Sequence, residues 1–404
     1  MRSRTLFAAT ALVFGLVACD KDSNPVSVEE TTNTRQSQLE NIVYEIDHLP
    51  SLGGTASSGN GINSRGLVVG SSNLAGDGSA HAAVWENGTL TDLGTLGGPN
   101  SNVAWPGINN NGDLIVGIAE TTAPGGVNWS CRFFFPATTG NQCLGFVYEN
   151  GVMTEIPTWP GGTNGFATGV NSQGQVVGWA ENGVEDPTCN DPVVHQFRGY
   201  VLDTRTGEMT ELTPLPGDST STGNAINQSG QVVGISGECS NAVGGFSAQH
   251  AVLWEPDGTA IDLGNIGGEA WHTPMDINER GEVVGFGNPA DVPGDAFGIQ
   301  AWYWNRHGGI VPLGVLEGQV TSQALGINNR GQVVGTSSGS PDGLRAFIWD
   351  GGELIDLNDL ADPDYEGTLL VAGHVNDAGV ITGVALDPDT GDQVAFVATP
   401  TGAE

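Results

Sequence analysis

One short pattern recurs seven times along this chain, and it constrains the fold more than any other feature. Each copy has an asparagine, a glycine three residues later and a second glycine after a β-branched run. The copies are INSRGLVVG (62–70), INNNGDLIVG (108–117), VNSQGQVVG (170–178), INQSGQVVG (226–234), INERGEVVG (277–285), INNRGQVVG (327–335) and VNDAGVITG (375–383). Repeats of about 50 residues are typical of propeller blades, whereas the coil of a solenoid is about half that length.

Two further segments repeat in step with this pattern. One is a short apolar run: AAVW (82–85), GFVY (145–148), GYVL (199–202), AVLW (251–254), AWYW (301–304), AFIW (346–349) and AFVA (395–398). The other is an LxxLGG-like segment: 49–54, 93–98, 156–162, 212–217, 263–268, 313–318 and a degraded copy at 357–362. Each unit therefore predicts four short strands. Strand A ends in Ile/Val-Asn, B is the Val-Val-Gly run, C is the apolar run, and D precedes LxxLGG.

The three series are offset, and the offset predicts how the chain closes. The first LxxLGG segment precedes every asparagine copy, and the last apolar run (395–398) has no strand D after it. We therefore expect the strand from Val43 to Leu49 to complete the last blade, which removes open sheet edges. The fold class predicted is all-β, a seven-bladed β-propeller with four strands per blade over residues 43–400, followed by a tail at 401–404.

The asparagine pattern itself is predicted to be a structural turn between strands A and B. A type I turn favours Asn at its first position and Gly at its fourth. The Asn side chain can accept a backbone hydrogen bond within the turn, and the second Gly indicates a bend or a close backbone approach. Seven similar copies spread around a ring cannot converge on one site. The A–B rim is therefore expected to be the rim least suited to function.

The amino terminus has the features of a bacterial lipoprotein leader. Arg2 and Arg4 precede an apolar run, and residues 16–19 (LVAC) resemble a lipobox. We expect cleavage after residue 18, acylation of Cys19 and a flexible tether over 19–42. The mature protein would then be held on a lipid bilayer at the cell envelope, in the periplasm or on the cell surface. An ordinary secretory signal is the alternative, and it also exports the chain.

The charge balance excludes one class of partner. The chain has 12 Lys+Arg against 46 Asp+Glu, a formal net charge of −34. Such a surface repels the phosphates of nucleic acids, so no nucleic-acid partner is expected. We expect a monomer.

Four cysteines follow Cys19, and an even number in an exported protein predicts two disulfides. Cys131 and Cys143 bracket one loop and are expected to pair locally. Cys189 and Cys239 then pair across neighbouring blades. These bonds either pre-organise a binding surface or only protect long loops from proteolysis, and both alternatives stay open. No CxxC spacing suggests zinc.

The repeats resemble the HAF family of probable extracellular repeats over about residues 43–400. The resemblance rests on the GINxxGQVVG stretch, the DLGTLGG segment and a His or Arg at the start of strand C, as at His81, His250 and Arg345. The equivalent positions in blades 2, 5 and 7 depart from it, with Leu144, Gln300 and Val394. The resemblance implies export and a repeat architecture. It implies no catalytic activity and no functional residue.

The opposite rim, where the B–C loops vary in length and the four cysteines lie, is the expected place for a site. Several aromatic side chains lie near it. Trp105, Trp129, Trp159, Trp271 and His272 are the candidate ligand-binding residues, because exposed aromatic rings stack on sugars or grip peptides. For Trp105, Trp159 and Trp271, packing in the core is the alternative. Trp85, Trp254, Trp304 and Trp349 repeat at one strand position and are expected to pack between blades.

Signals for catalysis and for metals are weak. The sequence has no GxSxG, HExxH or phosphate-binding loop. No catalytic residue and no cofactor is predicted. The acidic turns DPDY (362–365) and DPDTGD (387–392) could hold a structural calcium ion, but ordinary turn chemistry is the preferred explanation. The predicted function is a non-catalytic envelope lipoprotein that binds a glycan or an exported protein on its variable-loop rim. An enzyme acting on extracellular polysaccharide and a purely structural envelope protein are the alternatives.

Overall fold

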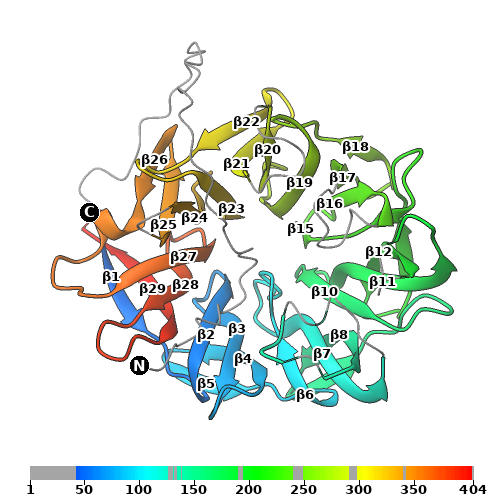
Figure 1. Cartoon of the computed structure of the whole chain (residues 1–404), viewed down its shortest axis with the longest axis horizontal. Coiled ribbons are helices and arrows are strands. Elements are labelled where there is room, and N and C mark those ends of the chain that lie inside the picture. Colours follow the sequence, from blue (N-terminus) through cyan, green and yellow to red (C-terminus); the bar gives the residue numbers. More distant parts are fainter. Residues whose placement is uncertain are drawn as a thin grey trace, which may run out of the picture.

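The computed structural model describes residues 42–125, 131, 134–137, 139–189, 194–239, 249–290, 298–339 and 343–402. Within these residues the strands form seven antiparallel blades around a central axis, with the A strands innermost (Figure 1). The blades are as follows. Blade 1 is β2 (Gly53–Ile62), β3 (Val68–Leu74), β4 (Ala80–Glu86) and β5 (Thr89–Asp92). Blade 2 is β6 (Gly97–Asn102), β7 (Leu114–Pro124), β8 (Asn141–Glu149) and β9 (Val152–Glu155). Blade 3 is β10 (Gly165–Val170), β11 (Gln175–Glu185), β12 (His195–Asp203) and β13 (Met209–Leu212).

The remaining blades follow the same order. Blade 4 is β14 (Thr220–Ser221) with β15 (Ala225–Ile226), β16 (Val232–Gly237), β17 (His250–Trp254) and β18 (Ala260–Asp262). Blade 5 is β19 (Gly267–Ile277), β20 (Val283–Pro289), β21 (Gln300–Asn305) and β22 (Gly309–Gly314). Blade 6 is β23 (Thr321–Ile327), β24 (Val333–Gly339), β25 (Gly343–Asp350) and β26 (Glu353–Asp356), followed by the 3-10 turn η1 (Leu357–Leu360). Blade 7 is β27 (Thr368–Val375), β28 (Ile381–Leu386), β29 (Gln393–Thr401) and β1 (Val43–His48).

The first strand of the chain completes the last blade, as the sequence predicts. β1 pairs antiparallel with β29, from Val43 opposite Thr401 to His48 opposite Phe396. Figure 1 shows this pairing beside the C terminus. The Tyr44 side chain of β1 is 1% exposed and packs in the cluster between blades 6 and 7. Both termini of the propeller are thus held in one sheet.

Each pair of neighbouring blades shares its own apolar core. Between blades 7 and 1, for example, Ile62 and Trp85 pack against Ala395. Trp254 and Trp304 are buried at the same strand position in other blades, and Trp349 is half-buried against Tyr303. The sequence prediction that these tryptophans pack between blades is confirmed.

The asparagine pattern forms the predicted turns. The fourth residue of each turn is a glycine in the left-handed region, where a Cβ would be strained. These glycines are Gly66, Gly112, Gly174, Gly230, Gly281, Gly331 and Gly379, with φ between 71° and 83°. In each turn the glycine amide bonds to the asparagine carbonyl oxygen, as from Gly331 to Asn328 at 3.0 Å. The Oδ1 of Asn328 also accepts from the amides of Arg330 and Gln332, both at 3.0 Å.

The same asparagines also link the blades to one another. The Nδ2 group of Asn328 donates to the backbone carbonyl oxygen of Asn376 in the next blade, at 3.0 Å. Asn376 donates to Asn63 in the same way, which carries the chain of bonds across the junction of blades 7 and 1. The donors of such bonds are Asn63, Asn171, Asn227, Asn278, Asn328 and Asn376. The remaining equivalent residue, Asn109 of blade 2, donates instead to the side chain of Asp113 in its own turn. We call these seven buried side chains the asparagine belt.

The second glycine of each pattern allows strand B to approach strand A closely. A Cβ on Gly335 would lie 1.9 Å from the carbonyl oxygen of Gln323, and one on Gly383 would lie 1.8 Å from that of Val371. The same clash would occur at Gly70, Gly117, Gly178, Gly234 and Gly285. The predicted close backbone approach is therefore confirmed.

The remaining repeated residues form a cross-strand pair. The His or Arg at the start of strand C faces the Asp at the end of strand D. Nδ1 of His81 lies 2.9 Å from Asp92, and Nε of Arg345 lies 2.7 Å from Asp356. The repeated His/Arg and DLG residues are thus two halves of one structural contact.

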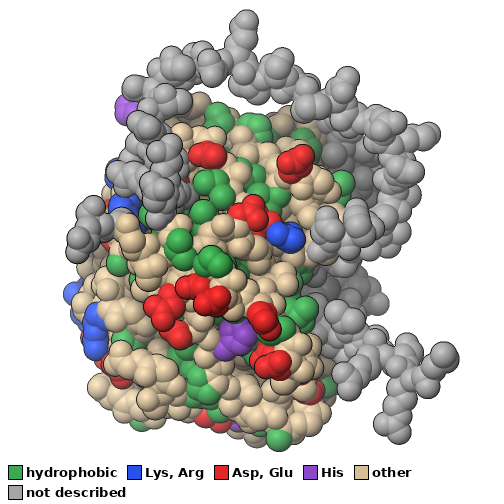
Figure 2. Space-filling model, turned by 90° about the vertical axis from the view of Figure 1, so that its left-hand side faces the viewer, with side chains coloured by type: hydrophobic (Ala, Val, Ile, Leu, Met, Phe, Trp, Pro, Cys, Tyr) green, Lys and Arg blue, Asp and Glu red, His purple; other side chains and the backbone are tan. Residues whose placement is uncertain are grey.

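The outer edge of blade 7 is strongly acidic. Figure 2 views the molecule from this side and shows acidic side chains around a histidine. His48 of β1 lies 3.0 Å from the hydroxyl oxygen of Tyr365 and 3.7 Å from Asp387. These contacts join β1 to two loops of blade 7, so they support the closure of the ring.

The belt makes a measurable prediction. Asn328→Ala removes a turn acceptor and an interblade donor, whereas Asn109→Ala removes turn bonds without an interblade bond. Loss of a buried hydrogen bond costs about 1 to 3 kcal/mol, so we expect Asn328→Ala to lower the free energy of unfolding by about 1 kcal/mol more than Asn109→Ala. Urea unfolding of both variants measures this. Equal losses would contradict an energetic role for the interblade bond.

Candidate functional site

A cavity of about 120 Å³ opens at the centre of the A–B rim. Residues from all seven blades line it, taken from the ends of the inner strands and from the A–B turns. We call it the channel-mouth pocket. It lies on the rim where the repeat is most uniform, which the sequence indicated as the rim least suited to function.

Two residues break the repeat inside this pocket. The residue two before each belt asparagine, here the inner position, is small in five blades: Gly61, Gly107, Gly169, Ala225 and Gly326. In blade 5 it is Asp276, and in blade 7 it is His374. The small residues leave the central volume open, so the two large polar side chains have room to enter it.

Asp276 and His374 meet across blade 6. Oδ2 of Asp276 lies 3.3 Å from Nε2 of His374, and their side chains are 10% and 17% exposed. Gly326 of blade 6 lies against the histidine, since a Cβ there would be 2.9 Å from its Cα. In β19 and β27 the strand pairing shifts register at this position. The same bulge occurs at the inner position of β2, β10 and β23, so it is a feature of the repeat and not of these two blades alone.

Both side chains are also held by backbone groups, one from the same strand and two from other blades. Oδ2 of Asp276 accepts from the amide of Ile327 at 2.9 Å, and Oδ1 accepts from the amide of Ile277 at 2.8 Å. Nδ1 of His374 lies 3.1 Å from the carbonyl oxygen of Ile62. The dyad therefore ties blades 5, 6, 7 and 1 together and is fixed in orientation.

Two more carboxylates stand at the entrance. The residue directly after the belt asparagine, here the mouth position, is Glu279 in blade 5 and Asp377 in blade 7, and both are exposed. Partial burial raises the pKa of Glu279 above its ordinary value, and the negative charges of Asp377 and Asp276 add to this shift. A hydrogen bond from the amide of Gln228 opposes it. The entrance therefore holds negative charges that repel one another.

The pocket has the chemistry of a polar binding site. It offers carboxylate oxygens, an imidazole and the belt asparagines around a confined volume. Over the described ranges, no three His, Cys, Asp or Glu side chains come close enough to form a metal-binding group. The acidic turns at 362–365 and 387–392 form hydrogen bonds within themselves, as from the Asp389 amide to Asp387 at 2.8 Å.

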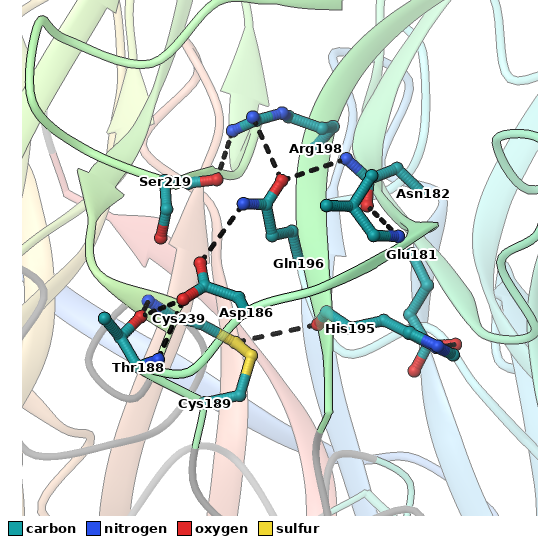
Figure 3. Close-up of a disulfide and its surroundings, with 11 residues drawn as sticks. Glu181, Asn182, Asp186, Thr188, Cys189, His195, Gln196, Arg198, Ser219 and Cys239 are labelled. Carbon is teal, nitrogen blue, oxygen red and sulfur yellow. Dashed lines mark hydrogen bonds and ion pairs between the residues drawn. A yellow bond between two sulfur atoms is a disulfide. The ribbon is translucent and has the colours of Figure 1, made fainter.

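The opposite rim is braced by the two disulfides. Cys131 pairs with Cys143 and Cys189 with Cys239, so the predicted connectivity is confirmed. The second bond joins the B–C loops of blades 3 and 4 across 50 residues of sequence (Figure 3). The disulfides indicate an oxidising, exported environment. No helix in the described part of the chain is long and apolar enough to cross a bilayer.

A polar network surrounds the Cys189–Cys239 bond, as Figure 3 shows. Asp186 accepts from the amide and the hydroxyl of Thr188, at 2.8 and 2.7 Å, and from Gln196 at 3.2 Å. Burial acts to raise the pKa of Asp186, but these hydrogen bonds outweigh it and the pKa is lowered. The Thr188 hydroxyl in turn accepts from the amide of Cys239 at 3.1 Å. These contacts hold the two loops together beside the disulfide, which favours a structural role.

The aromatic candidates lie mostly in the interior. Trp105 and Trp271, each 5% exposed, belong to one apolar cluster that spans blades 2 to 7 on the variable-loop side. His272 is fully buried, and burial lowers its pKa. Trp159 is half-buried and donates to the carbonyl oxygen of Arg198 at 3.2 Å. Trp129 lies outside the described residues. For Trp105 and Trp271 the structure thus shows the packing alternative.

Sequence reasoning missed the channel-mouth pocket because it treated the seven copies as equivalent. The signal was present at the inner position, where five small residues accompany one Asp and one His. A comparison of the copies column by column finds both residues. Only the closed ring shows that blades 5 and 7 bring them together.

Comparisons with known proteins support the fold alone. No protein-family model and no curated protein matches the chain. Among solved structures, an oligogalacturonate lyase in complex with manganese is 13% identical, with a TM-score of 0.50 over 91% of this chain and 96% of that one. Virginiamycin B lyase from Staphylococcus aureus is 11% identical, with a TM-score of 0.50 over 88% and 99%. Acylaminoacyl peptidase from Pyrococcus horikoshii is 11% identical, with a TM-score of 0.49, and this chain covers 53% of that longer protein.

The disulfides should contribute unequally to stability. Cross-linking stabilises more when it closes a longer loop, by about 4 kcal/mol for 50 residues and about 3 kcal/mol for 12. We therefore expect the Cys189→Ser/Cys239→Ser variant to lose more unfolding free energy than Cys131→Ser/Cys143→Ser. Denaturant unfolding of the two double variants decides the order. A reversed order would contradict the view that the cross-blade bond is the stronger brace.

Proposed function

We propose that this protein is an exported, non-catalytic binding propeller that takes a small polar ligand in the channel-mouth pocket. The leader and lipobox support an anchor through acylated Cys19 at the cell envelope. The repeats support membership of the HAF type. The site differs from the variable-loop rim that the sequence indicated, because the aromatic candidates there are largely buried.

The observation that carries the proposal is the Asp276–His374 dyad. A propeller with seven equivalent blades needs only small residues at the inner position. Two blades instead present a carboxylate and an imidazole, and these meet in the cavity at 3.3 Å. Partly buried polar groups cost free energy unless they are well paired, so their placement at a position that lines the cavity favours a binding role.

Binding fits the dyad better than catalysis. Both oxygens of Asp276 and both ring nitrogens of His374 already contact partners. These contacts fix both side chains in one orientation. The hydroxyl of Thr168, which also lines the pocket, is directed at the carbonyl oxygen of Gly223 at 2.8 Å. The groups are therefore arranged to hold a shape rather than to exchange a proton.

A ligand screen on the full chain, expressed with its own leader, tests the proposal. The panel contains simple oligosaccharides, amino acids and short aliphatic amines, and the readout is the melting temperature. A ligand that binds only the native state raises it by mass action. We expect at least one class to raise the melting temperature of the wild type but not that of His374→Ala.

His48→Ala is the matched control, because it removes a histidine–carboxylate contact on the outer edge of blade 7. It should respond to the ligand as the wild type does. A ligand that stabilises His374→Ala as much as the wild type would show that it binds outside this pocket. If no compound changed the melting temperature, the result would count against a binding role.

A further inference from the structure

We infer that the channel-mouth pocket recognises a cationic nitrogen group, either a primary ammonium or a guanidinium. The group would be carried by a free amine or by a Lys or Arg side chain of an exported polypeptide. This inference rests on the proposed function and specifies its ligand. Three observations support it. They are the cavity, the two residues that depart from the repeat, and the fact that most hydrogen-bond donors at the entrance already have partners.

Negative charge is concentrated around this pocket. Asp276 inside it and Glu279 and Asp377 at its entrance place three carboxylates, from blades 5 and 7, around one small cavity. A single imidazole, that of His374, accompanies them. Partly buried charges interact more strongly than charges in open water, so a cation entering here is stabilised.

Most backbone donors at the entrance already have partners. In five of the seven blades the backbone amide at the mouth position bonds to the side chain at the mouth position of the next blade. Glu279 donates in this way to Asn329, and Asn329 to Asp377, both at 2.8 Å. Gln228 donates to Glu279 at 3.1 Å. These amides are therefore not available to bind an anion. A carboxylate oxygen has more than one lone pair, so it can accept a further hydrogen bond from a ligand.

The arginines near the entrance are engaged in contacts with the A–B turns. Arg280 follows Glu279, but its Nη1 donates to the carbonyl oxygen of Asn329 at 2.6 Å and its Nη2 contacts Glu282. Arg65 in blade 1 donates to the carbonyl oxygen of Asn111 at 2.6 Å. Arg330 lies over Gly379 of the next turn. These side chains bridge the A–B turns and leave the carboxylates of the entrance for a ligand.

A cationic organic group fits better than a bare metal ion. The carboxylates lie around the wall of the cavity and do not form a metal-binding group among the described residues. Ammonium and guanidinium groups are satisfied by separate hydrogen bonds to several acceptors, which such a wall can supply.

The test uses variants that copy residues of other blades. Glu279→Gln copies Gln228, and Asp377→Asn copies Asn329, so each keeps the acceptor that the neighbouring amide needs. The probes are n-butylammonium, methylguanidinium and a lysine tripeptide with blocked ends, and neutral n-butanol and calcium chloride are tested beside them. The full chain is titrated, and affinity is read from the concentration dependence of the melting temperature.

We expect a cationic probe to bind the wild type, and either variant to bind it about tenfold more weakly, since a charged hydrogen bond is lost. Glu353→Gln, on an exposed outer strand, removes the same charge far from the pocket and should change nothing. A response to the small amines alone indicates a free amine as ligand, and a stronger response to the tripeptide indicates a polypeptide.

The pH dependence gives a second readout. Since the fold raises the pKa of Glu279, the native state holds that proton more tightly than the unfolded chain does. Stability without ligand should therefore fall slightly as pH rises above the ordinary value of 4.5, while affinity for the cation rises. The charged groups facing Glu279 are Asp276 with its partner His374, and Asp377. Glu279→Gln should melt at a slightly higher temperature than the wild type at neutral pH and still bind the probe more weakly.

The outcomes separate this inference from the function on which it rests. If neutral sugars bind in a manner that depends on His374 and the amines do not, the pocket is a binding site but the cation assignment is wrong. The assignment is also wrong if calcium alone stabilises the protein. If no probe binds at all, the inference and the proposed function both fail.

Discussion

The structure depends on the asparagine belt, because one side chain performs two tasks there. Its oxygen closes the A–B turn of its own blade, and its amide group reaches the backbone of the next blade. A short turn motif thereby becomes a connection between neighbouring blades at six of the seven junctions, with Asn109 as the exception, and the bond from Asn376 to Asn63 carries it across the point where the two ends of the chain meet. The pairing of β1 with β29 secures the same junction on the outside. Glycines complete the design, because strand B can approach strand A only where no Cβ intervenes.

Because the seven blades repeat so regularly, the positions that depart from the repeat are informative. At the inner position a small residue suffices for packing, and five blades have one. Asp276 and His374 depart from that rule in blades that are not neighbours, yet both reach one cavity over Gly326. Closure of the ring brings Asp276 and His374, which are 98 positions apart in the sequence, into contact. The rim with the most regular sequence thus contains the most distinctive chemistry.

Much of the fold could be predicted from the sequence, because repetition averages out local ambiguity. The strand order, the shared last blade, the turn glycines and both disulfides follow from spacing and turn chemistry. The site could not be predicted in that way. Trp105 and Trp271 have the side chains of ligand-binding residues, but the chain buries them in a cluster to which blades 2 to 7 all contribute. Similarly, nothing local to Asp276 reveals His374. Burial and long-range pairing are properties of the closed ring, and no window of sequence contains them.

A double-mutant cycle on Asp276 and His374 tests the central claim most directly. The unfolding free energies of Asp276→Ala, His374→Ala and the double variant are compared with that of the wild type. Each single change leaves a polar partner without its contact, while the double change restores the small residues found in the other blades. We expect a coupling energy of about 1 kcal/mol, within the range for residues in contact, so that the double variant loses less than the sum of the two single losses. If the losses of unfolding free energy were additive, the two side chains would not be in contact. The proposed binding site in the channel-mouth pocket would then lose its main support.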